Sequence, residues 1–147
     1  MFLTGRSSHQ IDDKGRIRIP TKFKDILGAN PFITVGKNNC LYIYPKATAE
    51  TIFETKFGDV DGYGNDPKLE MMHKIFSQGD FVEEDKQGRI YLQSYHLKHL
   101  FGDGEPKKNV ISIGMRDRVE LWAEDVWNAY DSAISLDEIF AKMAKSE

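Results

Sequence analysis

Three basic residues near the N-terminus have the types and spacing needed to bind a nucleic acid. Lys14 lies in a predicted turn, and Arg16 and Arg18 alternate with isoleucines in residues 16–20. A period of two predicts a strand that carries both arginines on one face and the isoleucines on the other. A two-stranded ribbon fits the major groove of DNA, where an arginine can bind O6 and N7 of guanine together. The alternative is that Arg16 only forms an ion pair with Asp12 across the turn.

A tight turn joins this segment to a preceding predicted strand, residues 6–11. Gly15 is suited to the positive φ angle that the end of such a turn requires. Asp12 can accept hydrogen bonds from the amides of its own turn. We therefore predict structural roles for both residues, with Asp12 also pairing with the nearby arginine.

The same pattern recurs 73 residues further along the chain. In residues 84–93, Asp85, Gly88 and Arg89 take the places of the aspartate, glycine and arginine of residues 11–20. A short apolar stretch, two strand-like runs and a helix-like segment follow each copy. Four short strands make too small a core to be stable alone. We therefore expect two copies that complete each other's core in a mainly β protein with helices, of the α+β class.

Outside the repeated strands the sequence predicts helices. The predicted units are residues 5–47 and 79–125 for the two copies, 48–78 for connecting helices and 126–147 for a C-terminal helical segment. In the last of these, Ser135 and Glu138 have the spacing of a capping box. They open a helix whose apolar face consists of Leu136, Ile139, Phe140 and Met143. Such a stripe is more typical of a core or a docking surface than of a cofactor site.

The composition is that of an ordinary globular protein. The chain has 147 residues, of which 40% are hydrophobic and one is a cysteine, and its net charge is -3. No apolar run is long enough to predict a membrane span or a signal peptide, so we expect a cytoplasmic protein. Residues 1–30 carry six basic and three acidic residues, whereas the rest carries 14 basic and 20 acidic ones. This asymmetry is typical of a protein with one basic, adhesive face.

The residues that could support catalysis or bind a metal are few. His96 and His99 can share one helix face, but two histidines without a further nearby ligand do not define a zinc site. Cys40 opens an apolar strand and is expected to be a small buried residue. The sequence contains no phosphate loop, nucleophile elbow or dinucleotide fingerprint. We therefore predict no catalytic residue, metal, cofactor or small-molecule substrate.

The two copies and their surroundings resemble the MraZ family, which is built from two AbrB/SpoVT-type units. The matching segments are Met1-Phe2 with Gly5, residues 11–20, Cys40-Leu41 leading to Tyr44-Pro45, residues 81–90, and Ile113-Gly114 leading to Glu120-Leu121-Trp122. The resemblance implies a swapped-hairpin, double-split pseudo-barrel. It also implies a sequence-specific DNA-binding regulator of transcription, chiefly of its own division and cell-wall gene cluster, and assembly of several chains into a ring.

The resulting hypothesis places DNA at the two turns. The residues expected to contact it are Lys14, Arg16, Arg18, Lys86 and Arg89, and the turn-forming residues are Asp12, Gly15, Asp85 and Gly88. The expected partners are double-stranded DNA with tandem short sites and further copies of the chain, in the cytoplasm at the nucleoid. The second copy has Gln87 in place of Lys14 and acidic residues at 83–85, so we expect it to contact DNA less strongly. The alternative is an antitoxin-like module that binds DNA and, through its C-terminal tail, another protein.

Overall fold

The strands and helices alternate along the chain as the repeat predicts. The computed structural model describes residues 2–104 and 108–146, so Met1, which opens the matched pattern, lies outside the described residues. The strands are β1 (Arg6–Gln10), β2 (Arg16–Arg18), β3 (Phe32–Val35), β4 (Leu41–Tyr44), β5 (Asp80–Phe81), β6 (Arg89–Tyr91), β7 (Asn109–Met115) and β8 (Arg118–Ala123). The helices are α1 (Thr21–Leu27), α2 (Lys46–Phe57), α3 (Pro67–Ser77), α4 (Ser94–Phe101), α5 (Glu124–Ala133) and α6 (Leu136–Ser146), with a 3-10 turn at Lys37–Asn39. The predicted α+β class is confirmed.

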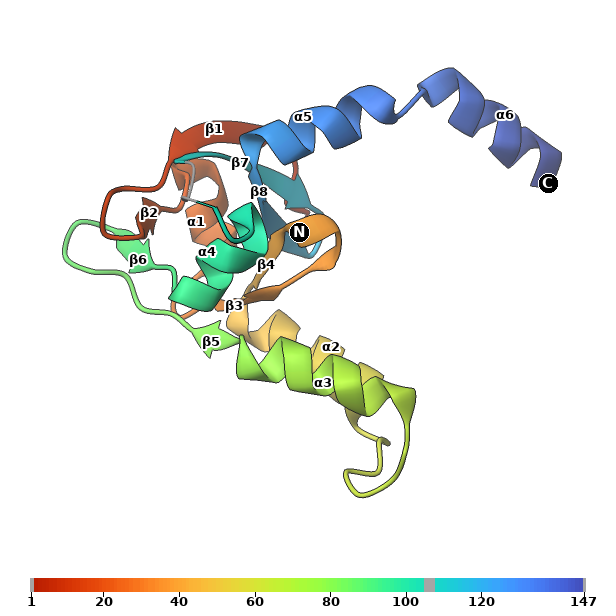
Figure 1. Cartoon of the computed structure of the whole chain (residues 1–147), viewed down its shortest axis with the longest axis horizontal. Coiled ribbons are helices and arrows are strands. Elements are labelled where there is room, and N and C mark those ends of the chain that lie inside the picture. The colour runs from red at the N-terminus through yellow and green to blue at the C-terminus, as the bar shows by residue number, and fades with distance from the viewer. Residues whose placement is uncertain (1, 105–107, 147) are drawn as a thin grey trace.

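Strands from the two copies pair with one another. The larger sheet has the order β1-β7-β8-β4-β3-β5, and β2 and β6 form a separate ribbon (Figure 1). The first-copy strand β1 pairs with the second-copy strand β7, and β4 pairs with β8. In the ribbon, Ile17 of β2 lies opposite Ile90 of β6. Each copy therefore supplies strands that the other copy needs.

The expectation of a hairpin within each copy needs a correction. The strands on either side of the first turn, β1 and β2, do not pair with each other, because β1 pairs with β7 and β2 with β6. Only the base of the turn is closed locally, by a hydrogen bond from the Asp12 amide to the Arg16 carbonyl. The exposed ribbon is therefore assembled from both copies. The swapped-hairpin, double-split pseudo-barrel implied by the family remains an expectation beyond this pairing.

One core lies beneath the ribbon and holds the two copies together. Ile17 and Ile90 are 3% and 0% exposed, whereas Arg18, which lies between Ile17 and the buried Ile19 in the sequence, faces solvent. Phe23 of α1 and Leu100 of α4 enter the same cluster. Burying such a side chain contributes about 1.5–3 kcal/mol relative to leaving it exposed. This packing fixes the ribbon on the sheet and so fixes the position of both turns.

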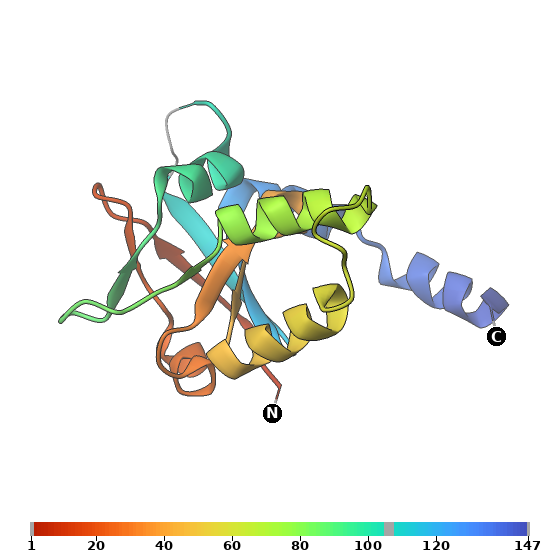
Figure 2. The same cartoon turned by 90° about the horizontal axis from the view of Figure 1, so that it is seen from below.

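The longer helices lie outside this core. Helices α2 and α3 lie beside each other at one end of the sheet, joined by the loop of residues 58–66 (Figure 2). Helix α5 packs on β7 and β8 through Trp127, whose ring centroid is 5.1 Å from that of Trp122. Helix α6 extends away from the rest of the molecule in both views (Figure 1). The sequence predicted a helix opened by Ser135, and α6 begins at the next residue, Leu136.

Candidate nucleic-acid interface

The two turns at the ends of the β2–β6 ribbon have the same hydrogen bonding. In the first, Asp12 Oδ1 accepts from the amides of Lys14 and Arg16, both at 2.9 Å. In the second, Asp85 Oδ1 accepts from the amides of Gln87 and Arg89, at 2.8 and 3.0 Å. The glycine that ends each turn, at positions 15 and 88, has a φ angle of 77°. A side chain in that left-handed conformation would be strained, which explains why both turns carry glycine there.

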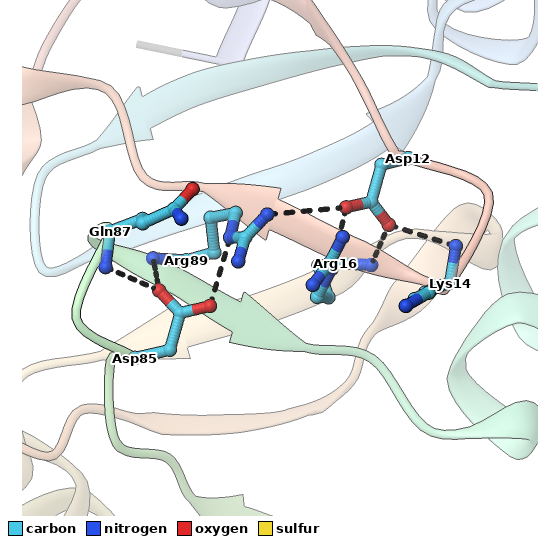
Figure 3. A network of polar contacts seen from close by, with 6 residues as sticks. All are labelled: Asp12, Lys14, Arg16, Asp85, Gln87 and Arg89. Atoms are coloured by element: carbon cyan, nitrogen blue, oxygen red, sulfur yellow. Dashed lines mark hydrogen bonds and ion pairs between the residues drawn. The ribbon is translucent and has the colours of Figure 1, made fainter.

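The aspartate of each turn also holds an arginine side chain. Arg16 Nε donates to Asp12 Oδ2 at 2.6 Å, and Arg89 Nε donates to Asp85 Oδ2 at 2.8 Å. A further contact crosses between the copies, because Arg89 Nη1 lies 3.9 Å from Asp12 Oδ2 (Figure 3). Each Nε contact uses one of the five N–H groups of a guanidinium. The aspartate therefore fixes the direction of the guanidinium, while remaining N–H groups can still donate to a ligand.

The ion pairs keep the turn aspartates charged. For Asp12, partial burial acts to raise the pKa, but hydrogen bonds from Arg16 and from the Lys14 amide lower it further than burial raises it. For Asp85, the hydrogen bond from the Arg89 amide is the main cause of a lowered pKa. The same Asp12 contact raises the pKa of Arg16. At neutral pH both aspartates are therefore ionised, and Arg16 is held as a cation.

The basic residues singled out from the sequence lie on one ribbon. Arg18 and Arg89 are directly opposite each other across β2 and β6, and Arg16 is opposite Tyr91, whose ring centroid is 6.0 Å from its guanidinium carbon. Lys14 and Lys86 are exposed in the two turns. The structure thus brings the five predicted DNA-contacting residues together around the outer face of the ribbon. Whether they contact DNA stays a prediction.

Two features of this surface were missing from the sequence analysis. Glu84, one of the acidic residues next to the second turn, forms an ion pair with Lys24 of α1 at 3.0 Å, which reduces the negative charge there. A shallow groove of about 480 Å³ also runs beside the ribbon. It is lined by Ser7, His9, Gln10, Asp12, Arg16, Arg18, Ile19, Pro20, Thr21 and Arg89. Alternate residues of 6–10 lie on the same face of a strand, so the sequence could have predicted the polar side chains that β1 contributes to this groove.

Histidine 9 in this groove is held as a neutral group. Its Nε2 lies 2.6 Å from Ser112 Oγ on the paired strand β7, and burial lowers the pKa of the imidazole. A neutral imidazole and a hydroxyl can exchange hydrogen bonds with a sugar or a phosphate but add no charge. The positive charge of the groove therefore comes from the arginines.

Three residues were considered for catalysis or metal binding: Cys40 is buried, and His96 and His99 are hydrogen-bonded to backbone groups. Cys40 is 1% exposed, and burial is the main cause that raises the pKa of its thiol. His96 Nδ1 accepts from the Gln93 amide at 3.1 Å, and its Nε2 donates to the Gln78 carbonyl at 2.7 Å. His99 Nε2 lies 3.0 Å from the Gly36 carbonyl. Within residues 2–104 and 108–146, no three such ligands are grouped around a possible metal position, and no helix is long and apolar enough to cross a membrane.

The fold and the site define a two-copy α+β protein with an arginine-bearing ribbon assembled from both copies. The model of the family "MraZ protein, putative antitoxin-like" matches residues 2–58 and 75–146, which include both turns. The chain belongs to the MraZ family, which confirms the resemblance drawn from its motifs.

Relatives match over nearly their full length. A protein of Clostridium tetani is 34% identical over 146 residues, covering 99% of this chain and 98% of the relative. One of Alkaliphilus oremlandii is 35% identical over 147 residues, with 99% and 98% covered. One of Caldanaerobacter subterraneus is 36% identical over 141 residues, with 94% of both chains covered. Each of the three is named transcriptional regulator MraZ.

Proposed function

We propose that this chain is a sequence-specific DNA-binding regulator of transcription, and that it binds DNA through the outer face of the β2–β6 ribbon. The observation that carries the proposal is the pair of arginines, Arg16 and Arg89, each oriented by the aspartate of its own turn. A guanidinium oriented in this way loses little conformational freedom when it binds a base edge or a phosphate. The names of the relatives support the same function.

The surroundings of the ribbon favour a polyanion as ligand. The chain as a whole is slightly acidic, yet Lys14, Arg18 and Lys86 lie exposed around the two arginines. Each phosphate that such a group neutralises releases counterions from the DNA, which makes binding strongly dependent on salt. Lys14 and Lys86 are suited to phosphates at the two ends of the ribbon, and the arginines between them are suited to base edges.

The first copy contributes more to this contact in our proposal. Arg89 lies close to two carboxylates, Asp85 and Asp12, and its positive charge is therefore more fully compensated than that of Arg16, which is bonded to Asp12. The second turn also has Gln87 where the first has Lys14. A less compensated arginine next to a lysine attracts DNA more strongly.

We also propose that several chains assemble into a closed ring that binds tandem short sites near a promoter. One ribbon neutralises few phosphates and would bind weakly at physiological salt. Ribbons repeated at fixed spacing raise the effective concentration of each further contact.

The family relationship makes the chain's own division and cell-wall gene cluster the first target to test, and the nucleoid the expected location. In this proposal the chain is not an enzyme.

Selection from random DNA tests the function directly. Purified protein is incubated with a pool of random duplexes, and bound DNA is sequenced after several rounds. We expect a short enriched sequence, present as tandem repeats upstream of the chain's own gene and protected there in footprinting. Arg16→Ala protein is the matched control and should enrich little. A pool that stays random with the parent protein would refute sequence-specific binding.

The antitoxin-like alternative shares the DNA contact and differs at the C-terminus. It is favoured by the exposed apolar face of α6, which could bind a toxin. A free antitoxin tail is usually disordered and is cut rapidly after Lys142 in limited proteolysis, whereas a docked helix resists cleavage. Protection of that bond in the purified protein would count against a free tail.

A further inference from the structure

Helix α6 exposes an apolar face that packs against nothing in the described chain. Its four members occupy positions i, i+3, i+4 and i+7 of one stripe. The exposed fractions are 65% for Leu136, 40% for Ile139, 63% for Phe140 and 54% for Met143. Four adjacent apolar side chains left in water on a regular helix are typical of a surface that another protein covers.

A second apolar surface lies between α2 and α3, on the other side of the molecule. It is a groove of about 320 Å³ that is open to solvent. Its lining residues are Phe32, Ala49, Glu50, Phe53, Glu54, Phe57, Gly58, Met72, Phe76 and Phe81. The ring of Phe53 contacts those of Phe57 and Phe76, with centroids 6.0 and 5.5 Å away, so the aromatic wall is fixed before anything binds. Phe76 and Phe81 remain 44% and 45% exposed.

The chain's own α6 is poorly placed to fill this groove. Helix α5 is fixed by aromatic contacts of Trp127 and Tyr130 with Trp122, and Arg6 lies 3.8 Å from Asp131 near its end. Only Ile134 and Ser135 separate α5 from α6. Two residues span about 7 Å at most, so α6 must begin where α5 ends. From there it points away from the body (Figure 1).

We propose that α6 of one chain docks, through its apolar stripe, into the α2/α3 groove of a second copy. Anchors at i, i+3, i+4 and i+7 are the pattern by which an amphipathic helix occupies an apolar groove. An 11-residue helix is about 16 Å long and a 12-residue helix about 18 Å, so α6 matches the length of the groove wall formed by α2. This inference deepens the assembly part of the proposed function by naming the surfaces that meet.

The charges beside the two surfaces complement each other. Helical geometry places Lys142 on one flank of the α6 stripe and Asp137 on the other. The α2 wall of the groove carries Glu50 and Glu54, and on α3 Lys68 is in the same row as the groove residue Met72. One orientation of α6 therefore sets Lys142 against the α2 acids and Asp137 against the α3 lysine. The reverse orientation sets like charges together.

Docking of this kind links chains head to tail. The helix of each chain occupies the groove of the next, so the two contact surfaces are different and a two-fold axis is not required. Repeated around a closing rotation, this contact gives a ring. Each ribbon keeps the same position relative to its neighbour, as binding to tandem sites requires.

The decisive experiment mixes two variants, each lacking one of the two surfaces. Phe140→Asp damages the stripe and Met72→Asp damages the groove, with Phe76→Asp as a second groove variant. The matched controls are Ala141→Asp on the opposite face of α6 and Met71→Asp on the solvent side of α3. Sedimentation velocity at micromolar concentration should show a multi-chain species for the parent and both controls. It should show 16.8 kDa monomers for each damaged variant.

An equal mixture of the two damaged variants should then form a species of two chains and no larger one. The intact helix of the groove variant can enter the intact groove of the stripe variant, and no surfaces remain for growth. A monomeric parent, damaged variants that stay assembled, or a mixture that stays monomeric would each overturn the docking.

A second measurement, binding to a duplex with one site, distinguishes failure of the docking from failure of the proposed DNA-binding function. Monomeric variants should keep one-site affinity, and a parent that binds no DNA would refute the DNA proposal while leaving the docking result intact.

Discussion

Replacing Arg16 tests the ribbon as a DNA-binding surface. Its guanidinium is held by Asp12 at 2.6 Å, and its side chain is 19% exposed beside the groove. Arg16→Ala removes the fork but keeps the turn, because the Asp12 carboxylate still accepts hydrogen bonds from two backbone amides. The fold should therefore survive, and any loss of DNA affinity reports the missing side chain.

The expected loss follows from the number of contacts removed. A bidentate contact between an arginine and a guanine changes the affinity by about 5- to 150-fold. On a duplex with one site, Kd for Arg16→Ala should rise within that range. On two tandem sites bound by one assembly, two contacts are lost and the increase should be about 25-fold or more. Arg16→Lys keeps the charge without the planar fork, so its affinity should be closer to that of the alanine variant than to the parent.

Fluorescence anisotropy on the selected duplex, read at several salt concentrations, measures these changes. Arg116→Ala is the control, because Arg116 is an exposed arginine in the β7–β8 turn, at the end of the sheet opposite the Asp12 turn. Its substitution should leave Kd within about twofold of the parent value. If Arg16→Ala has the parent's Kd and melting temperature, the ribbon is not the DNA-binding surface.

Three further outcomes are expected. Lys14→Ala should weaken binding to all sequences alike and lower the salt slope by about one, if Lys14 contacts a phosphate, and an unchanged slope would contradict that contact. Arg89→Ala should cost less affinity than Arg16→Ala, and equal losses would show that the copies contribute alike. Burial lowers the pKa of His96 from 6.5, so His96 binds a proton more readily in the unfolded chain than in the folded chain. The free energy of unfolding should fall as pH drops below 6.5, by at most about 1.4 kcal/mol per pH unit for this group, in urea titrations. His96→Gln should flatten that dependence relative to the exposed His73→Gln, and an unaltered slope would contradict the assignment.

Much of the local structure follows from short stretches of sequence. The alternation in residues 16–20 correctly predicted buried isoleucines and outward arginines, because a strand turns successive side chains to opposite faces. The start of α6 was predictable from the capping spacing of Ser135 and Glu138 and from the apolar stripe that follows. The two-residue strand β5 was missed, since two residues show no period.

The family was also readable from the sequence, because its signal is a repeated local motif. An aspartate, a glycine and an arginine within five residues make almost all their defining contacts with one another, as the bonds of Asp12 and Asp85 show. Such contacts depend little on the rest of the chain. A pattern of this kind is therefore recognisable before any fold is known.

What only the tertiary structure decided is which strands pair and which surfaces remain uncovered. The sequence suggested a hairpin around each turn, but β1 pairs with β7 and β2 with β6. That choice depends on one core shared by residues more than 70 positions apart, and no single segment contains it. The contact of Arg89 with Asp12 follows from this pairing, as does the ribbon itself. The apolar stripe of α6 was visible in the sequence, but whether the chain buries it is settled by the direction of α5, which the packing of Trp127 on Trp122 determines.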